Sequence, residues 1–324
     1  MRAQLLYAVG DLRLVDVPKP QVKADDVLVA VRACGVCPTD LRKFKTGNHG
    51  VPHWPFNMGH EWAGDVVEVG AEVERFQVGQ RVAVCGYGAY TDLVAVPRAW
   101  WDVDRRMVVI PDTLSYEDAT FMEPLADCIR AVEVQANARL GDTIVISGAG
   151  QMGLQQTMIA KAKGAKAIVI DVVDERLEAA LRFGADAVVN ARKEDPVAKV
   201  KELTGGQGAH AAVVSNRAPQ AVEQAMQMVR KLGRVVLFAG FEYNTKVSFD
   251  PNIVHYNEVT LMGSYGVGLG QQRDLGLFER AVETLAAGSL PVSELVTHRF
   301  PLEQLREALD VVDRAAGLKV VITY

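Results

Sequence analysis

Residues 142–153 read Asp-Thr-Ile-Val-Ile-Ser-Gly-Ala-Gly-Gln-Met-Gly, and this stretch decides the fold. A β-rich run leads directly into a glycine-rich turn, and a helical pattern follows as far as residue 162. A second apolar run, residues 167–170, ends at Asp171. A G-x-G-x-x-G match alone is weak, but the order strand, glycine turn, helix and strand makes it strong. This order predicts a unit that binds a dinucleotide.

Each glycine of this motif has a physical task. Gly148 permits the tight turn, Gly150 lets the backbone approach a pyrophosphate, and Gly153 lets the helix pack closely on the strand. The helix that begins near Gln151 and Met152 then presents its N-terminus to the phosphates. We expect these five residues to bind the cofactor.

Asp171 indicates which dinucleotide is bound. It lies 23 residues after Gly148, close to the separation expected for the carboxylate that accepts hydrogen bonds from the adenosine ribose. Its charge would repel a 2′-phosphate, so NAD is preferred over NADP. The alternative is an Asp that merely ends a strand. Arg176 could pair with a 2′-phosphate, but we expect it to flank the adenosine or to face solvent.

The remaining patterns divide the chain into two domains. Apolar runs that alternate with helical patterns predict further strands of a parallel sheet buried on both faces, at residues 187–189, 211–214 and 234–238. Residues 1–123 alternate short β-rich runs with turn signals, as antiparallel sheets do. We expect an α/β fold with a doubly wound parallel sheet in residues 124–266. A mainly antiparallel β domain would comprise residues 1–123 together with residues 267–324, which look like returning amphipathic helices.

A second group of residues offers ligands for a metal ion. Cys37 lies in the run Cys-Gly-Val-Cys-Pro-Thr-Asp at residues 34–40, His60 and Glu61 follow as Gly-His-Glu, and Glu123 precedes the nucleotide-binding unit. Zinc accepts thiolate, imidazole and carboxylate ligands together, and a catalytic site keeps three protein ligands with one open position. We expect Cys37 and His60 to be the first two ligands and Glu123 to be the third.

Two polar residues next to Cys37 suit supporting roles. Asp40 can accept the second ring N–H of a ligating histidine and so fix its tautomer. Thr39 stands beside the expected metal with a hydroxyl that can pass a proton. Both are therefore candidate catalytic residues.

The cysteines allow another interpretation. Cys34 and Cys37 could form a redox pair or, with Cys85 and Cys128, a structural zinc site with four thiolates. Cys34, however, ends the alternating apolar stretch 27–33 and is expected to pack inside a strand. Cys85 and Cys128 have no partner at the spacing of a zinc knuckle.

Composition excludes several classes of protein. With 324 residues and 49% hydrophobic content, the chain can bury two cores. A net charge of −5 gives no footprint for nucleic acid or an anionic membrane. No apolar stretch approaches the roughly 20 residues of a transmembrane helix, and the N-terminus has no signal-peptide pattern. Four cysteines do not make a disulfide framework, so we expect a cytoplasmic protein.

These motifs resemble the medium-chain, zinc-dependent alcohol dehydrogenase superfamily over nearly the full chain. Further similar segments lie at residues 64–70, 78–84, 88–94 and 317–322. The resemblance implies a GroES-like catalytic domain in which Cys37 and His60 bind zinc. It makes Glu61 a neighbour that can approach or replace a ligand, and Glu123 either the third ligand or the holder of the zinc-bound water. The Glu-Pro-Leu form at residues 123–125 is most similar to the polyol and threonine dehydrogenases.

Three departures from the family carry information. Residues 85–90 run without the four-cysteine lobe of many members, so one catalytic zinc per chain is expected. Arg42 stands where many members have a proton-relaying histidine, and a guanidinium cannot be a general base. The relay would then pass through His49, His53 or water, or Arg42 would bind an anionic group. Gly266 replaces an arginine of the sorbitol-type members, which argues against a sugar-alcohol substrate.

The sequence therefore predicts a zinc- and NAD-dependent enzyme that oxidises a small-molecule secondary alcohol or polyol to a ketone, with Thr39 passing the proton. An amino alcohol, as in threonine dehydrogenases, is the alternative substrate, and a binding protein without turnover is the alternative class. Residues 259–262 resemble the edge strand through which family members pair, which predicts a homodimer or homotetramer.

Overall fold

The computed structural model describes residues 1–47, 51–266 and 275–324. The chain forms two compact units, Met1–Ala126 with Val267–Tyr324, and Asp127–Gly266. The α-helix α3 (Met122–Ile129) contains the point where the chain passes from one unit to the other. Among the described helices, none combines the length and apolar character needed to cross a membrane.

The second unit is built on a parallel sheet, as the alternating apolar runs predicted. In its described residues six strands pair in the order β10-β9-β8-β11-β12-β13, and every pair is parallel. The strands are β8 (Thr143–Ser147), β9 (Lys166–Asp171), β10 (Ala187–Asn190), β11 (Ala209–Val214), β12 (Val229–Leu237) and β13 (Thr260–Gly263). The central strands are apolar and buried because helices cover both faces.

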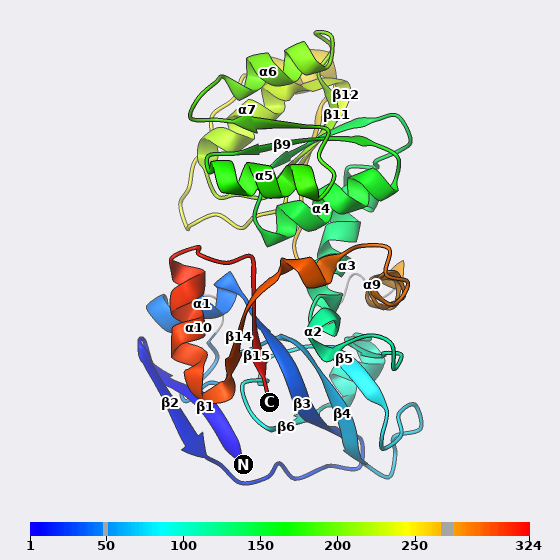
Figure 1. The fold of residues 1–324 in the computed structure, drawn as a ribbon, viewed down its shortest axis with the longest axis vertical. Helices are drawn as coiled ribbons and strands as arrows, with labels where there is room; N and C mark the ends of the chain where they lie inside the picture. The colour runs from blue at the N-terminus through cyan, green and yellow to red at the C-terminus, as the bar shows by residue number, and fades with distance from the viewer. Residues whose placement is uncertain (48–50, 267–274) are drawn as a thin grey trace. The chain divides into compact units, whose positions relative to one another are not determined.

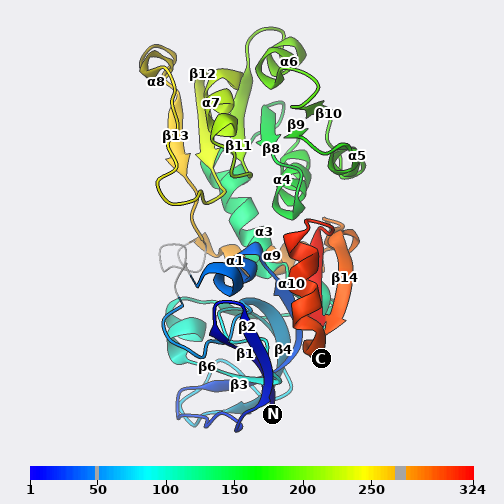
Figure 2. The ribbon, with the colours of Figure 1, turned by 90° about the vertical axis from the view of Figure 1, so that its left-hand side faces the viewer.

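Helices lie on the two faces of this sheet in chain order. One face carries α4 (Gln151–Ala162) and α5 (Asp174–Arg182), and the other carries α6 (Pro196–Leu203) and α7 (Pro219–Met228), as Figures 1 and 2 show. The unit also contains η2 (Arg130–Gln135) and α8 (Pro251–Asn257). This arrangement is the doubly wound fold, and it places the turn after β8 at the carboxyl edge of the sheet, where such folds bind ligands.

The first unit is organised around a mostly antiparallel sheet. In the described residues its path is β14-β15-β3-β4-β5-β7, with β6 also paired to β3, and only β14 and β15 run parallel to each other. The strands are β3 (Val27–Val36), β4 (Glu61–Val69), β5 (Arg81–Cys85), β6 (Leu93–Val96), β7 (Met107–Val109), β14 (Val296–Pro301) and β15 (Lys319–Thr323). β1 (Arg2–Ala8) and β2 (Asp11–Asp16) form a separate hairpin. The aromatic side chains of Trp62, Phe76 and Tyr90 are buried in the core of this unit.

The C-terminal segment differs from the sequence interpretation, which predicted only helices there. Two predicted helices are present as α9 (Leu277–Ala286) and α10 (Leu305–Asp313), but β14 and β15 also join the sheet of the first unit. Short apolar runs such as β15 do not reveal their structure through periodicity alone. β15 is a strand because it pairs with β3, which lies far away in the sequence.

The remaining helices of the first unit are short, and one of them begins just after Cys37. They are α1 (Pro38–Thr46), α2 (Tyr116–Ala119), η1 (Ala99–Val103), η4 (Val292–Leu295) and η5 (Leu302–Gln304). Helix α1 lies beside α10 (Figure 1), and Lys45 and Asp313 form an ion pair of 2.5 Å between them. The C-terminal helix therefore supports the helix that begins at Cys37.

His210 joins two strands of the parallel sheet through a neutral ring. Thr143 donates its backbone N–H to Nδ1 of His210 at 2.9 Å, and Nε2 lies 3.1 Å from Oδ1 of Asp142. An acceptor at Nδ1 requires the proton to sit on Nε2. Burial lowers the pKa of His210 and Arg230 adds to this effect, while Asp142 opposes it.

Acidification should weaken this contact. Because the pKa of His210 is lowered in the folded state, its contribution to stability is present at neutral pH and is lost as the pH falls. We expect the melting temperature to fall between about pH 7.5 and pH 5.5, and to fall less steeply in His210→Asn, which has no titrating ring. Calorimetry of both proteins measures the two slopes. Equal slopes would show that His210 does not contribute to the pH dependence.

Candidate metal centre

The sequence around Cys37 folds into a capped helix start that fixes two polar side chains. Cys37 is the N-cap of α1, and Pro38 follows in the first turn, where a missing backbone N–H costs nothing. The Sγ atom of Cys37 accepts from the backbone N–H of Thr39 at 3.5 Å. In return, Oδ2 of Asp40 accepts from the backbone N–H of Cys37 at 3.1 Å. The thiol is thereby held at the positive end of a helix, where a thiolate is stabilised.

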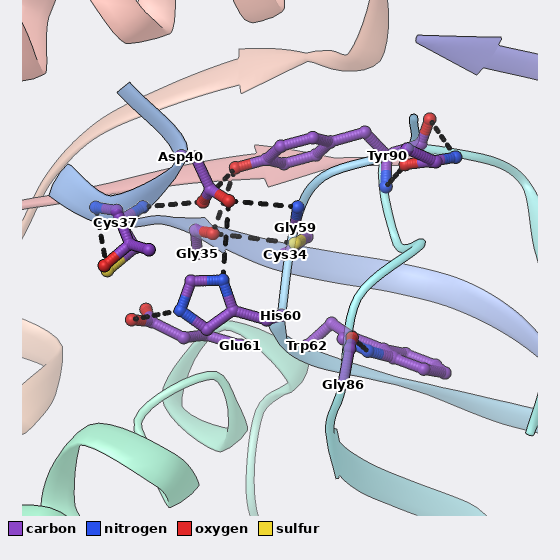
Figure 3. A network of polar contacts seen from close by, with 12 residues as sticks. Cys34, Gly35, Cys37, Asp40, Gly59, His60, Glu61, Trp62, Gly86 and Tyr90 are labelled. Carbon is purple, nitrogen blue, oxygen red and sulfur yellow. Dashed lines mark hydrogen bonds and ion pairs between the residues drawn. The ribbon is translucent and has the colours of Figure 1, made fainter. Parts of the chain in front are cut away.

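Three potential metal ligands converge beside this helix start. Ligand atoms of Cys37, His60 and Glu61 all lie within 4.8 Å of one another. Cys37 comes from α1, His60 precedes β4, and Glu61 is the first residue of β4 (Figure 3). Nε2 of His60 is 3.8 Å from Oε1 of Glu61, so this ring nitrogen faces the group. The three side chains offer sulfur, nitrogen and oxygen to one point.

A buried carboxylate approaches the histidine from the other side. Asp40 is fully buried, and its Oδ1 lies 3.4 Å from Nδ1 of His60. Oδ1 also accepts from the backbone N–H of Gly59 at 3.2 Å, and Tyr90 donates its hydroxyl to Oδ2 at 3.0 Å. Figure 3 shows Asp40 between Tyr90 and the imidazole ring. Such a carboxylate fixes the ring so that Nε2 is left for a metal.

The electrostatics of the group favour a bound cation. Burial raises the pKa of the Cys37 thiol, and the carboxylate of Glu61 raises it further. Burial alone would lower the pKa of His60, but Asp40 and Cys37 outweigh it and hold that pKa well above its usual range. Burial also opposes the charge of Asp40, whose pKa is nevertheless lowered, first by His60 and then by the N–H groups of Cys37 and Gly59.

Zinc fits this donor set. The buried carboxylates of Asp40 and Glu61 and the thiol of Cys37 surround the imidazole ring of His60 and favour its positively charged form. A bound divalent cation would supply this positive charge instead. It would also let Cys37 bind as a thiolate, which is the form that coordinates metal. Thiolate, imidazole and carboxylate together are ligands that zinc accepts.

Glu123, the third ligand that the sequence suggested, lies outside the group of three potential ligands. The group of three that the described residues bring together contains Glu61 and does not contain Glu123. Glu123 is half-buried in the first turn of α3. Its charge helps to raise the pKa of Tyr87, although burial, Asp40 and Cys37 raise that pKa more. The ring of Tyr87 lies 4.9 Å from that of His60. Direct ligation by Glu123 remains a prediction.

The other residues near the expected proton path are placed as follows. Thr39 is half-buried one residue into α1, and Arg42 lies further along the same helix. His53 is exposed, with Nδ1 3.0 Å from the carbonyl oxygen of Pro55. His49 lies outside the described residues. The relay that the sequence assigned to His49, His53 or water therefore stays a prediction.

The cysteine alternatives lose their support. The four cysteines are free. Cys34 is buried within β3, as the alternating pattern predicted, and the metal-type group formed by the described residues contains only Cys37 among the cysteines. Only residues 86–92 separate β5 from β6, so the first unit has no room there for a four-cysteine lobe.

The second unit presents the glycine turn in the geometry that the sequence predicted. Gly148 has φ +113°, which an L side chain rarely adopts, and a Cβ on Gly153 would lie 1.8 Å from the carbonyl oxygen of Gly148. Gly150 is the N-cap of α4. A Cβ added to it would meet no described atom within 4 Å, so the backbone of Gly150 faces open space. Beside it, Nε2 of Gln151 is buried with no hydrogen-bond partner in the described residues. This unsatisfied donor and the open glycine suit a dinucleotide phosphate.

Asp171 has a structural task that the sequence did not reveal. Its Oδ2 accepts from the backbone N–H of Ala149 at 2.7 Å, inside the glycine turn. Its Oδ1 accepts from the backbone N–H groups of Val172 at 2.7 Å and Val173 at 3.1 Å. A carboxylate has about four acceptor sites, so one remains for a ribose hydroxyl. Of the other predicted cofactor residues, Met152 lies in the first turn of α4 and Arg176 in that of α5.

Comparisons with known proteins agree with this architecture. A family model described as zinc-binding dehydrogenase matches residues 150–284, and one described as alcohol dehydrogenase GroES-like domain matches residues 23–103. A sorbitol dehydrogenase from Bacillus subtilis (strain 168) is 31% identical, with 96% of this chain and 93% of the relative covered. A D-arabitol-phosphate dehydrogenase from Enterococcus avium gives the same three values. The crystal structure of 2R,3R-butanediol dehydrogenase from Bacillus subtilis is 26% identical, with a TM-score of 0.89 and 100% and 99% of the two chains covered.

Removing the support of His60 should weaken metal binding. We expect Asp40→Asn to lower zinc affinity by about 10- to 100-fold, the usual cost of losing a residue that orients a ligating histidine. Tyr90→Phe, which removes one of the hydrogen bonds to Asp40, should have a smaller effect in the same direction. Competition with a chelator measures both affinities. Unchanged affinity in Asp40→Asn would show that this carboxylate does not act on the metal site.

Proposed function

Because the chain belongs to the zinc-dependent medium-chain alcohol dehydrogenase family, in its polyol dehydrogenase branch, we propose that it oxidises a secondary alcohol or polyol to a ketone with NAD. The reaction moves a hydride from the carbinol carbon to the nicotinamide and releases the hydroxyl proton. The convergence of Cys37, His60 and Glu61 carries the proposal, since these three side chains could hold a metal ion in the GroES-like part of the chain.

Zinc at this point would supply Lewis-acid chemistry, which lowers the pKa of a hydroxyl group that it contacts. Cys37 and His60 are the ligands that we propose first, with Glu61 or Glu123 completing the set. Asp40 holds the ring of His60, and its own bonds to Tyr90 and Gly59 keep it in place. The chain thus builds the site before the alcohol arrives, which avoids reorganisation during the reaction.

Two further tasks fall to residues of this chain. Thr39 follows Cys37 by two positions at the start of α1, so we propose that its hydroxyl passes the proton from the alcohol toward solvent. In the second unit, Gly148, Gly150 and Gly153 shape the turn for the pyrophosphate, with Gln151 and Met152 at the helix start. Asp171 would accept a hydrogen bond from the ribose through its remaining acceptor site, and Arg176 would flank the adenosine.

The relatives suggest the class of substrate. They are named for sorbitol, D-arabitol phosphate and 2R,3R-butanediol, which all carry a secondary hydroxyl beside another oxygen-bearing carbon. We propose that the substrate of this chain is a vicinal diol or polyol. The chain differs from sorbitol-type members in having Gly266 where they have an arginine. A panel of diols, polyols, polyol phosphates and threonine, with NAD reduction followed at 340 nm, tests this choice and the amino-alcohol alternative.

Assembly and location are also predictions. In the described residues β13 is the last strand of the parallel sheet, and the edge of a sheet can pair with a second copy. We propose a homodimer or homotetramer that forms through this edge, in the cytoplasm.

Metal content gives the first test of the function. Elemental analysis of the purified protein should find about one zinc per chain, because three ligands converge once in the described residues and the cysteine lobe is absent. Cys37→Ala should lose both the zinc and the activity. Cys34→Ala is the matched control, since Cys34 is buried in β3 outside the group and should keep the metal. Two tightly bound zinc ions per chain would contradict the proposal.

Cofactor preference gives the second test. Asp171→Ser should lower NAD affinity more than NADP affinity, by about 10- to 100-fold in their ratio, since it removes charged hydrogen bonds and a repulsive charge. The variant also loses the acceptor for Ala149, so binding of both nucleotides should weaken. Titration with each nucleotide measures the two effects separately. Equal use of NAD and NADP by the unmodified enzyme would show that another residue, such as Arg176, sets the preference.

A further inference from the structure

Glu61 is held by a lysine from the far end of the chain. Nζ of Lys319 donates to Oε2 of Glu61, and the two side chains are 0% and 5% exposed. The other Lys and Arg ion pairs of the described residues keep at least 18% of each side chain exposed. Nζ of Lys319 also lies 4.8 Å from the ring centre of Phe121. This cation therefore has little contact with water, and its interactions inside the unit are correspondingly strong.

The pair crosses a strand at a position that has no side chain. In the sheet, Gly35 of β3 lies opposite Glu61 of β4 on one side and opposite Val321 of β15 on the other. Lys319 reaches Glu61 over Gly35: a Cβ at this glycine would lie 2.5 Å from Nζ of Lys319 and 2.7 Å from Oε2 of Glu61. The glycine leaves the space through which the two charged groups meet.

The two oxygens of Glu61 consequently have different surroundings. Oε2 contacts Lys319, whereas Oε1 faces Nε2 of His60 at 3.8 Å, on the side of the candidate metal ligands. A carboxylate can bind a metal through one oxygen or through both. With Oε2 engaged, Glu61 offers only one.

We propose that Lys319 is a positioning residue that restricts Glu61 to a single oxygen and keeps this carboxylate from filling the open position of the zinc site. The inference rests on the proposed zinc-dependent function. It assigns to Lys319 a role in keeping a position available for the alcohol, in addition to its packing in the sheet.

The sign of the effect separates this role from a purely structural one. The ammonium of Lys319 repels a divalent cation and competes with it for Glu61. Without Lys319, both oxygens of Glu61 are available, so zinc should bind more tightly while the alcohol finds its position occupied. A lysine that only stabilised the fold would, on removal, weaken zinc binding and turnover together.

Lys319→Met tests the proposal, because methionine fills a similar volume without charge. Zinc affinity is measured by competition with a chelator, and kcat and KM are measured with the best substrate of the panel. We expect zinc to bind about 10-fold more tightly, because the repulsion between the Lys319 ammonium and the cation is removed, and kcat/KM to fall by about 10-fold. Lys319→Arg keeps the cation and should stay within about threefold of the unmodified protein in both measurements.

Two further variants keep the test decisive. Lys319→Gln retains an N–H donor for Glu61 without the charge, so it should shift zinc affinity in the same direction if Lys319→Met does not fold. Glu61→Gln combined with Lys319→Met removes the carboxylate as well. This double variant should not show the increase in zinc affinity that we expect for Lys319→Met alone. Lys199→Met, at an exposed ion pair with Glu202 in α6, is the control for loss of a lysine and should change neither quantity.

The outcomes distinguish this inference from the proposed function. If the unmodified protein binds no zinc, the proposed function fails. If it binds one zinc, but folded Lys319→Met and Lys319→Gln hold that zinc equally or less tightly, only the role of Lys319 is overturned. Tighter zinc that persists after Glu61→Gln would also overturn it, since the gain would then not come from Glu61.

Discussion

A single buried carboxylate organises the metal centre. Asp40 has no solvent to satisfy it, so it takes hydrogen bonds from the N–H groups of Cys37 and Gly59 and from the hydroxyl of Tyr90. These partners come from the start of α1, from the segment before β4 and from the turn before β6. An unpaired buried charge would be costly, so these three segments cannot separate without a large loss of stability. Asp40 also lies 3.4 Å from Nδ1 of His60, so the segments that it holds together include those that carry Cys37 and His60.

The second unit uses the same device around Asp171. This carboxylate accepts from Ala149 in the glycine turn and from Val172 and Val173 after β9, so it ties the two loops at the carboxyl edge of the sheet. A residue that binds the ribose would thus also hold the turn that binds the pyrophosphate. Function and local stability are coupled here, and a substitution at Asp171 affects both. The ratio of the affinities for NAD and NADP is informative because the loss of local stability affects the binding of both nucleotides.

The sequence reveals the features that depend on local pattern. The glycine turn, the strands of the parallel sheet and the helix start at Cys37 follow from residue type and short spacing, and the structure contains them. Features that depend on distant pairing were not predicted. The roles of Tyr90 and Lys319 leave no periodic signal, and β14 and β15 become strands only through partners elsewhere in the chain. The choice between Glu61 and Glu123 near the metal likewise depends on packing that spacing does not encode.

The pairing of Glu61 with Lys319 has a consequence for how the centre is completed. The two residues are 258 positions apart, and the whole nucleotide-binding unit lies between them in the sequence. Cys37, His60 and Glu61 are all present in the first 61 residues, yet the carboxylate gains its buried cation only when β15 pairs with β3 across from β4. Contacts of such high sequence separation form late and slowly compared with local ones. On the role proposed for Lys319, the pairing of β15 with β3 is therefore what restricts Glu61 to one oxygen.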